Sequence, residues 1–429
     1  MKFLLFPFLG LLSVVGCTGV AAQNYICYYD SGSYYRSGLT QMWKDHLEPA
    51  LNVCTHLVYG YAGIQKGSFE LLRLRGRFDK FRYSEITGIS KKFSHLKVLL
   101  SVGGGRDVDE AHPNKYLEFL EANTTAQKNF IDSSINELKR KRFDGLDLAF
   151  QFPKNEPKKV NGPTGDFVVD PLAEQHKRQF TALVENLGNA LRSANLTLSL
   201  TVLPNVNSTW YYDVSKLHPQ VDFINLAAFD FITPLRNPEE ADYTAPIFFK
   251  DEHNRLPYLN VDFQVNYWLQ NGCPPNKLNL GMATYGQGWK MTSDSGQTSI
   301  PVVSRTNGPA PGGLLEDSLE WARWPELPGL FTWPDICEKL AKNSSAPLRQ
   351  VTDLTKKYGN YAIRPANEGG ENGMWLSFDG PDFAGVKATY AKGRNLGGMA
   401  IFDLSYDDYR GLCTGQKFPT LQAIKDVMG

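Results

Sequence analysis

Residues 143–153 read Phe-Asp-Gly-Leu-Asp-Leu-Ala-Phe-Gln-Phe-Pro, and this stretch decides how the rest of the chain is interpreted. Successive side chains of a strand point to opposite faces, so Asp147, Ala149 and Gln151 share one face and the intervening apolar residues share the other. A strand with these two faces is expected to lie between a core and a pocket. The stretch therefore predicts a strand whose polar face lines a pocket.

Seven further β-rich runs lie along the chain, separated by amphipathic stretches such as 129–140 and 173–194. These stretches are long enough for crossover helices, so the strands are expected to be parallel. Eight alternating units close most naturally as an α/β fold of the (β/α)8 TIM barrel type. The eight predicted strands are 25–29, 56–61, 97–102, 145–150, 196–203, 223–229, 278–284 and 398–402.

The 429 residues exceed one average domain, but barrels with insertions reach this length. The spacing is uneven only between predicted strands seven and eight, where about 110 residues intervene. We expect a small α+β insertion subdomain over residues 287–375, within a barrel that spans residues 23–429.

The N-terminus has the pattern of a secretory signal peptide. Lys2 precedes an apolar run over residues 3–15, and Val20-Ala21-Ala22 follows as a small-residue cleavage site. We predict that residues 1–22 are removed and that no later segment spans a membrane. The mature protein is therefore expected to be soluble, secreted and extracellular.

Composition excludes several function classes. The 45 basic and 45 acidic residues leave no net field that would attract nucleic acid. The seven histidines show no His-Glu-x-x-His spacing, and Gly103-Gly104-Gly105 is not followed by the Lys of a phosphate loop. We expect no metal and no cofactor.

Removal of Cys17 with the signal peptide leaves five cysteines in an oxidising compartment, so at most two intrachain disulfides form. Cys27 lies in the first predicted strand and Cys54 just before the second. These strands are neighbours in any barrel, so we pair the two cysteines. Cys273 is expected to be free, either as a buried thiol or with an outside partner.

Two surface features remain open at this stage. The basic run 139–142 suits a heparan-type polyanion, but it equally suits a helix C-terminus that cations complement. Four sequons are compatible with N-glycosylation of a secreted chain. They begin at Asn123, Asn195, Asn207 and Asn343.

Several motifs resemble those of the family 18 glycoside hydrolases, the chitinases. Their signature Asp-Gly-x-Asp-x-Asp-Trp-Glu is matched at Asp144, Gly145 and Asp147, but Ala149, Phe150 and Gln151 replace its last three residues. Phe402 stands where a tryptophan normally lies in the sugar subsite. Ser101-Val102-Gly103-Gly104 and Tyr285-Gly286 match two further elements of the family. Ala227-Ala228-Phe229-Asp230 stands where chitinases carry Met-x-Tyr-Asp and matches it only at Asp230. The resemblance also implies a disulfide between Cys337 and Cys413.

In this family one glutamic acid protonates the leaving oxygen while the substrate's own N-acetyl oxygen attacks. The resemblance places Gln151 at that acid, and an amide has no proton to transfer at physiological pH. Ala149 replaces the aspartate that orients the acetamido group, and Phe229 lacks a hydroxyl group that would bond it. We expect no useful chitin hydrolysis, with Asp144, Asp147 and Asp230 retained either for ligand contact or to hold the core.

Among chitinase-like chains, this one resembles the insect imaginal disc growth factors, through 143–153 and through long strings at 26–31, 55–62, 106–115 and 402–408. This resemblance implies a secreted, non-hydrolytic growth factor that promotes cell proliferation, survival or motility together with insulin-type signals. It also implies an unknown cell-surface receptor as partner and a monomeric protein.

A lectin is the alternative, because a chitinase groove can hold chitooligosaccharide on its aromatic residues without cutting it. Such a protein would act in extracellular matrix or cuticle. In a barrel, aromatic residues also serve simply as core. The candidate sugar-binding residues are Tyr59, Phe229, Asp230, Tyr285, Trp289, Trp375 and Phe402.

Overall fold

The computed structural model describes residues 23–154, 170–249, 255–293, 295, 303–304, 306–311, 313, 328–344, 346–366 and 373–429. The predicted signal peptide at residues 1–22 lies outside these residues, so its assignment stays a prediction.

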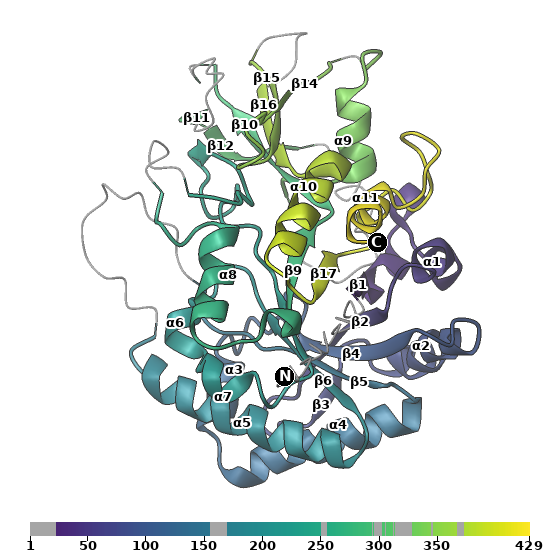
Figure 1. Ribbon diagram of the computed structural model, residues 1–429, viewed down its shortest axis with the longest axis vertical. Helices are drawn as coiled ribbons and strands as arrows, with labels where there is room; N and C mark the ends of the chain where they lie inside the picture. Colours follow the sequence, from purple (N-terminus) through teal and green to yellow (C-terminus); the bar gives the residue numbers. More distant parts are fainter. Residues whose placement is uncertain are drawn as a thin grey trace, which may run out of the picture.

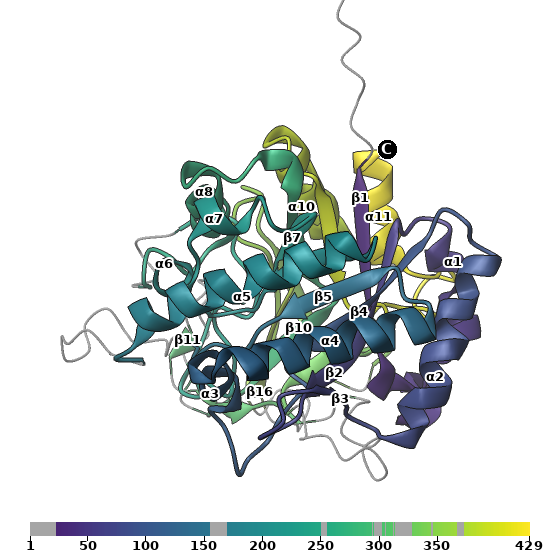
Figure 2. The same cartoon turned by 90° about the horizontal axis from the view of Figure 1, so that it is seen from below.

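Eight parallel strands of the described chain close into a barrel, which confirms the predicted fold (Figures 1 and 2). The strand order is β1-β17-β9-β7-β6-β5-β4-β2, and pairing of β1 with β2 closes the ring. The observed ends differ from the predicted ends by at most three residues. The strands are β1 (Asn24–Asp30), β2 (His56–Ile64), β4 (Lys97–Gly103), β5 (Gly145–Ala149), β6 (Thr197–Val202), β7 (Phe223–Leu226), β9 (Leu278–Ala283) and β17 (Gly398–Phe402).

Helices surround the barrel and bury the outward apolar face of each strand. On β5, Leu146 and Leu148 point outward, and Phe150 just beyond it packs on Phe180 of α5 at a ring distance of 5.0 Å. The helices are α1 (Lys44–Leu51), α2 (Arg77–Thr87), α3 (Lys115–Glu121), α4 (Thr124–Lys141), α5 (Ala173–Ser193), α6 (Ser208–Tyr211), α7 (Val214–Leu217), α8 (Val261–Gln270), α10 (Gly380–Gly393) and α11 (Pro419–Met428). Short 3₁₀ turns are η1 (Ser31–Tyr35), η2 (Gly38–Thr40), η3 (Gly88–Lys91) and η5 (Pro275–Lys277).

A second sheet lies between β9 and β17 in the chain and above the barrel in Figure 1. Its strand order is β12-β10-β16-β15-β14, with β13 paired to β10 and α9 (Trp333–Leu340) beside it. The assignment of residues 287–375 to a separate subdomain stays a prediction. The strands are β10 (Tyr285–Met291), β12 (Thr306–Pro309), β13 (Leu330–Thr332), β14 (Arg349–Thr352), β15 (Asn360–Arg364) and β16 (Gly373–Phe378). Small pairings add β3 (Leu71–Arg73) to β2, and β8 (Glu240–Ala241) to β11 (Val303–Ser304).

Two disulfides tie distant parts of the chain. Cys27 is bonded to Cys54, and Cys337 of α9 is bonded to Cys413, with Cα atoms 5.9 Å apart in both pairs. The second bond joins the added sheet's helix to the segment after β17. Cys273 is unpaired and buried, and burial raises the pKa of its thiol to about 12. This thiol is therefore almost entirely protonated and unreactive at neutral pH.

Three of the four sequon asparagines are exposed, and Asn207 is half-buried. The Asn123 and Asn207 side chains accept hydrogen bonds from backbone N–H groups at the starts of α4 and α6. Glycosylation of the four sites stays a prediction. Among the described helices, none is long and apolar enough to cross a membrane.

Candidate functional site

Asp147 lies inside the barrel, where alternation along β5 predicts it. Its carboxylate is fully buried and accepts hydrogen bonds from hydroxyls of the two neighbouring strands, β4 and β6, and of β1 across the barrel. Burial raises the pKa of Asp147, although these hydrogen bonds act in the opposite direction. The donors are Ser101, Ser199 and Thr201, each at 2.7 Å, and Tyr28 at 3.4 Å.

The polar contacts of Asp147 continue across the barrel. The Tyr28 hydroxyl lies 2.6 Å from Thr201 Oγ1 and accepts from the Asn225 amide at 2.8 Å. Asn225 in turn accepts from Asn279 at 3.0 Å. Buried polar groups are costly unless they are paired, and these groups pair with one another. Asp147 is therefore held by the barrel itself.

Asp144 lies at the opposite end of β5 from the cavity described below. Its carboxylate accepts from the backbone N–H of Val98 at 2.8 Å and lies 3.7 Å from Lys97 Nζ. Asp222 does the same for β6 by accepting from the N–H of Leu198 at 2.8 Å. These contacts hold Asp144 at the N-terminal end of β5, away from the cavity.

Gln151 is directed at the loop that follows β4. Its Nε2 donates to the carbonyl of Gly104 at 2.6 Å and to the carbonyl of Asp107 at 3.2 Å. Only the amide nitrogen can make these two bonds, because both partners are acceptors. Ala149 lies one pleat before it and accepts from the Gly104 N–H at 2.8 Å. Residues 149 and 151 thus fasten one loop.

A cavity of about 470 Å³ opens at the C-terminal ends of the barrel strands, where barrel active sites are built. Its size falls within the range of ligand pockets. Five residues singled out by sequence line it, namely Ala149, Phe229, Asp230, Tyr285 and Phe402. Asp144, Asp147 and Gln151 do not.

Tyr59, Trp289 and Trp375 do not line the cavity, and their assignment as sugar-contacting residues is wrong for this structure. Tyr59 packs in the outer core against Tyr29 and Tyr83. Trp289 and Trp375 are fully buried in the second sheet, with ring centres 5.7 Å apart. These rings complete a core, so they have no free face for a ligand.

The floor of the cavity is aromatic. Phe402 stacks on Tyr28 with ring centres 3.9 Å apart and planes inclined by 18°. Phe229 lies 5.2 Å from Phe402 and 6.2 Å from Tyr285. Flat apolar rings of this kind are suited to stacking against the apolar face of a sugar ring.

Asp230 is the acidic group on the wall beside Phe229. It accepts from the Tyr285 hydroxyl at 2.5 Å and from the Gln287 amide at 3.1 Å. Burial raises the pKa of Asp230, and these two hydrogen bonds offset only part of that effect. Its φ of 53° lies in the left-handed region, and its carbonyl accepts from Asn205, so the backbone is fixed there.

An ionic cluster also lies at the cavity, and the sequence did not predict it. Arg106 donates to Asp30 at 2.5 Å and to the Tyr406 hydroxyl at 3.1 Å. Asp30 also lies 3.6 Å from Arg36. Burial and the charge of Asp30 raise the pKa of Asp403 to about 6. The sequence offers one sign of this cluster, because each of its residues follows a predicted barrel strand. Many other polar residues also follow predicted strands, so this position alone does not identify the cluster.

The described residues contain no group of three or more His, Cys, Asp or Glu side chains that would suit a metal ion. The residues that line the cavity supply an aromatic floor, paired carboxylates and three cations. Those cations are Arg106, Lys154 and Arg236.

Comparison with known proteins gives the family. The glycosyl hydrolases family 18 model matches residues 24–407. The chitinase-like protein Idgf1 of Drosophila simulans is 64% identical over 448 aligned residues, which cover 100% of both chains.

Solved structures agree with this match. The Group IV chitinase of Ostrinia furnacalis, solved in complex with allosamidin, has a TM-score of 0.77 at 26% identity and covers 95% of this chain and 99% of its own. Human YKL-39, described as a pseudo-chitinase with retained chitooligosaccharide binding properties, has a TM-score of 0.76 at 24% identity and covers 95% and 100%; at that identity it shows the fold alone. The chain belongs to glycosyl hydrolase family 18, among the chitinase-like proteins of the imaginal disc growth factor type.

Proposed function

We propose that this protein is a secreted, non-hydrolytic growth factor that promotes cell proliferation, survival or motility together with insulin-type signals. The observation that carries the non-hydrolytic part is the Gln151 amide, which donates to the carbonyls of Gly104 and Asp107. The likeness to Idgf1 supports the growth-factor part. Secretion is supported by the residue pattern of 1–22 and by two disulfides, which persist in oxidising compartments.

The carboxylates that line the described cavity do not replace the missing acid. Asp30 is paired with Arg106 and Arg36, and Asp230 is bonded to Tyr285 and Gln287. Asp403 accepts from the backbone N–H and hydroxyl of Ser405 at 2.7 Å and 2.5 Å. A general acid must lie within reach of the leaving oxygen, and these three groups end or follow β1, β7 and β17, whereas residue 151 follows β5.

The test applies the purified protein to cultured imaginal disc cells with and without insulin. We expect more cells with the protein plus insulin than with either alone, and no effect of heat-denatured protein. In parallel, chitohexaose is incubated with the protein and with an active chitinase as control. Shortened sugars from the protein would overturn the non-hydrolytic assignment, and unchanged cell numbers would overturn the growth-factor assignment.

A second candidate function is chitooligosaccharide binding without cleavage. The stacked pair of Phe402 and Tyr28 at the floor of a 470 Å³ cavity favours it, because a sugar ring needs a flat apolar platform beside hydrogen-bonding groups. Asp230 and Tyr285 supply such groups on the wall.

Phe402→Ala is expected to weaken chitohexaose binding about 5- to 150-fold, if a sugar ring on this platform gains roughly the 1–3 kcal/mol that a base gains on an aromatic side chain. Isothermal titration measures the change. Phe81→Ala is the matched control, because Phe81 is 71% exposed on α2 and does not line the cavity. Equal affinities for the native chain and Phe402→Ala would contradict a sugar site on this floor. Neither result bears on cell growth, so the two functions are tested separately.

A further inference from the structure

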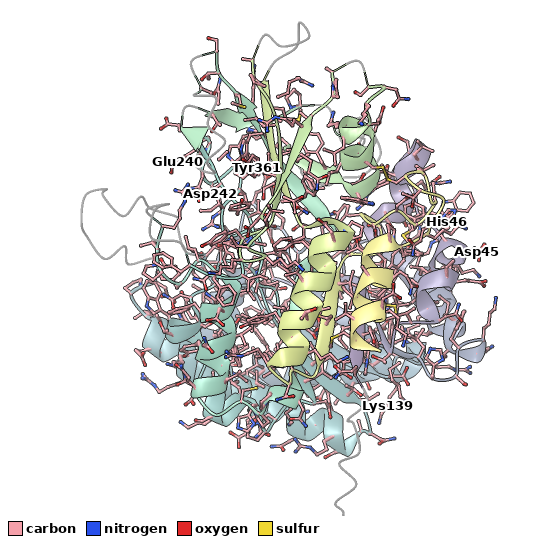
Figure 3. The ribbon with its side chains drawn as sticks, turned by 45° about the horizontal axis from the view of Figure 1, so that its top comes forward. Asp45, His46, Lys139, Glu240, Asp242 and Tyr361 are labelled. Carbon is pink, nitrogen blue, oxygen red and sulfur yellow. A yellow bond between two sulfur atoms is a disulfide. The ribbon has the colours of Figure 1, made fainter. Side chains whose placement is uncertain are left out.

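A concentration of positive charge lies at the end of the barrel opposite the cavity. Helix α4 ends in Lys139, Arg140 and Lys141, and Arg142 caps it in a left-handed conformation with a φ of 62°. The side chains of Lys139, Arg140 and Arg142 are exposed. Figure 3 places Lys139 at the lower margin of the molecule, far from Tyr361 of the second sheet.

A neighbouring helix adds to this charge. The Lys141 ammonium donates to the Lys80 carbonyl and to the Ser84 hydroxyl of α2, the latter at 2.9 Å. The Thr87 hydroxyl donates to the Lys141 carbonyl at 2.8 Å, so the start of η3 also lies against the end of α4. Figure 2 shows one end of α4 beside α2. Exposed Lys80 is thereby brought beside the basic end of α4, and exposed Lys91 ends the 3₁₀ turn η3 that starts at this contact.

We call Lys80, Lys91, Lys139, Arg140, Lys141 and Arg142 the α4 basic surface. The nearby acids already have partners, since Glu137 is bonded to Arg73 and Arg140, and Asp144 lies near Lys97. Within the described chain, four members have no ion-pair partner. They are Lys80, Lys91, Lys139 and Arg142.

The charges of this surface repel one another. Burial lowers the pKa of Lys141, and the positive charges of Arg140, Arg73 and Lys80 lower it further despite the opposing charge of Glu137. Cations at a helix C-terminus are favoured by the helix dipole, which accounts for those on α4. The dipole of α4 does not account for Lys80 and Lys91, which come from other elements. A bound polyanion would relieve the repulsion.

We propose that the α4 basic surface binds a sulfated polysaccharide. The whole chain carries 45 basic and 45 acidic residues, so the attraction is local to this surface. Sulfated polysaccharides are polyanions of the oxidising extracellular compartment that the two disulfides require, whereas nucleic acids are chiefly intracellular. The proposal takes only this compartment from the proposed function and does not depend on the cavity.

Binding here leaves the cavity open. Lys91 and Arg142 lie in the segments that enter β4 and β5, whereas Gly104 and Lys154, which line the cavity, follow the same two strands. The strands hold the two sites roughly 20 Å apart. A protein bound to a sulfated matrix through the α4 basic surface would still present its cavity and its second sheet to other partners.

The experiment measures binding of the full secreted protein to heparin at 0.15 M NaCl by surface plasmon resonance. The test variant is Lys91→Gln, Lys139→Gln and Arg142→Gln combined, which spares the contacts of Lys141 and Arg140. We expect its affinity to fall at least about tenfold, since each cation near an anionic surface contributes on the order of 1 kcal/mol. The control combines Arg178→Gln, Lys342→Gln and Lys417→Gln, which removes the same charge from exposed positions elsewhere. Its affinity is expected to stay within about twofold.

Several outcomes would overturn the proposal. They are absence of heparin binding by the native chain, equal affinity of the native chain and test variant, and an equal loss in the control variant. Desulfated heparin or double-stranded DNA that binds as tightly as heparin would also exclude a sulfate-specific role. Circular dichroism verifies that both variants fold, and an excess of chitohexaose is expected to displace none of the bound heparin.

Discussion

Asp147→Ala is expected to lower the free energy of unfolding by about 3–4 kcal/mol. The substitution removes the acceptor of Ser101, Ser199 and Thr201, which lie inside the barrel and cannot reach bulk water. Each buried donor left without a partner costs about 1–3 kcal/mol, although some hydroxyls will turn to new acceptors. Urea unfolding followed by circular dichroism measures the change as a lower midpoint at unchanged slope.

Asp147→Asn provides the matched control, with an expected loss of about 1 kcal/mol. The amide has the same shape and keeps one oxygen acceptor, while its NH₂ group can donate to hydroxyl oxygens. Burial already raises the pKa of Asp147, so removing its charge forfeits little. If the alanine variant were as stable as the asparagine variant, the carboxylate would not be organising the barrel interior.

The position of Asp147 could be predicted from sequence, but its partners could not. Alternation along residues 145–151 is a local property, and it placed Asp147 inside and Leu148 outside. Tyr28 and Asn225 reach the same network from strands that are 119 and 78 positions away in the chain, and their alternation alone names no partner. Barrel closure brings them together, and closure depends on all eight strands.

The aromatic residues show the same limit. Phe229 and Phe402 follow or end barrel strands, and both line the cavity as the position of those strands predicts. Trp289 and Trp375 belong to β10 and β16, whose register pairs them directly. The sequence alone does not show that the face of the sheet they share is covered by other residues. In the structure both rings are buried in that core and do not reach the cavity.

The basic run at 139–142 was ambiguous for a related reason. A helix C-terminus explains cations on α4, and nothing local in the sequence reveals that Lys80 and Lys91 lie beside them. The distinction between a capped helix and a binding surface arises only when α2 and α4 pack together.

Gln151→Glu is expected to cost about 1–3 kcal/mol of unfolding free energy at pH 7.5 without restoring chitin hydrolysis. The new carboxylate would face the carbonyls of Gly104 and Asp107, which now accept from the amide. Only a protonated carboxyl can donate to a carbonyl, so the pKa of the introduced Glu should lie above its usual value of about 4.3. When the folded-state pKa lies above the unfolded-state pKa, the protonated group contributes stability that is fully present below the unfolded-state pKa. That stability is lost as the pH rises through the folded-state pKa. The deficit should therefore shrink on acidification to about pH 4.

Gln151→Met separates charge from the lost hydrogen bonds, because methionine has a similar length and neither donates nor ionises. Its loss of stability is expected to be independent of pH between about 4 and 7.5, whereas the loss in Gln151→Glu grows over that interval.

Adding Ala149→Asp to Gln151→Glu is still expected to give no shortened chitohexaose by mass spectrometry. The acid would remain turned toward the 104–107 loop, and Phe229 and Phe402 would remain in place of the groups that an active subsite uses. Shortened sugars from the double variant would show that the loop releases residue 151 when substrate binds. If the Gln151→Glu variant were as stable as the native chain at every pH, the amide would not be fastening the loop.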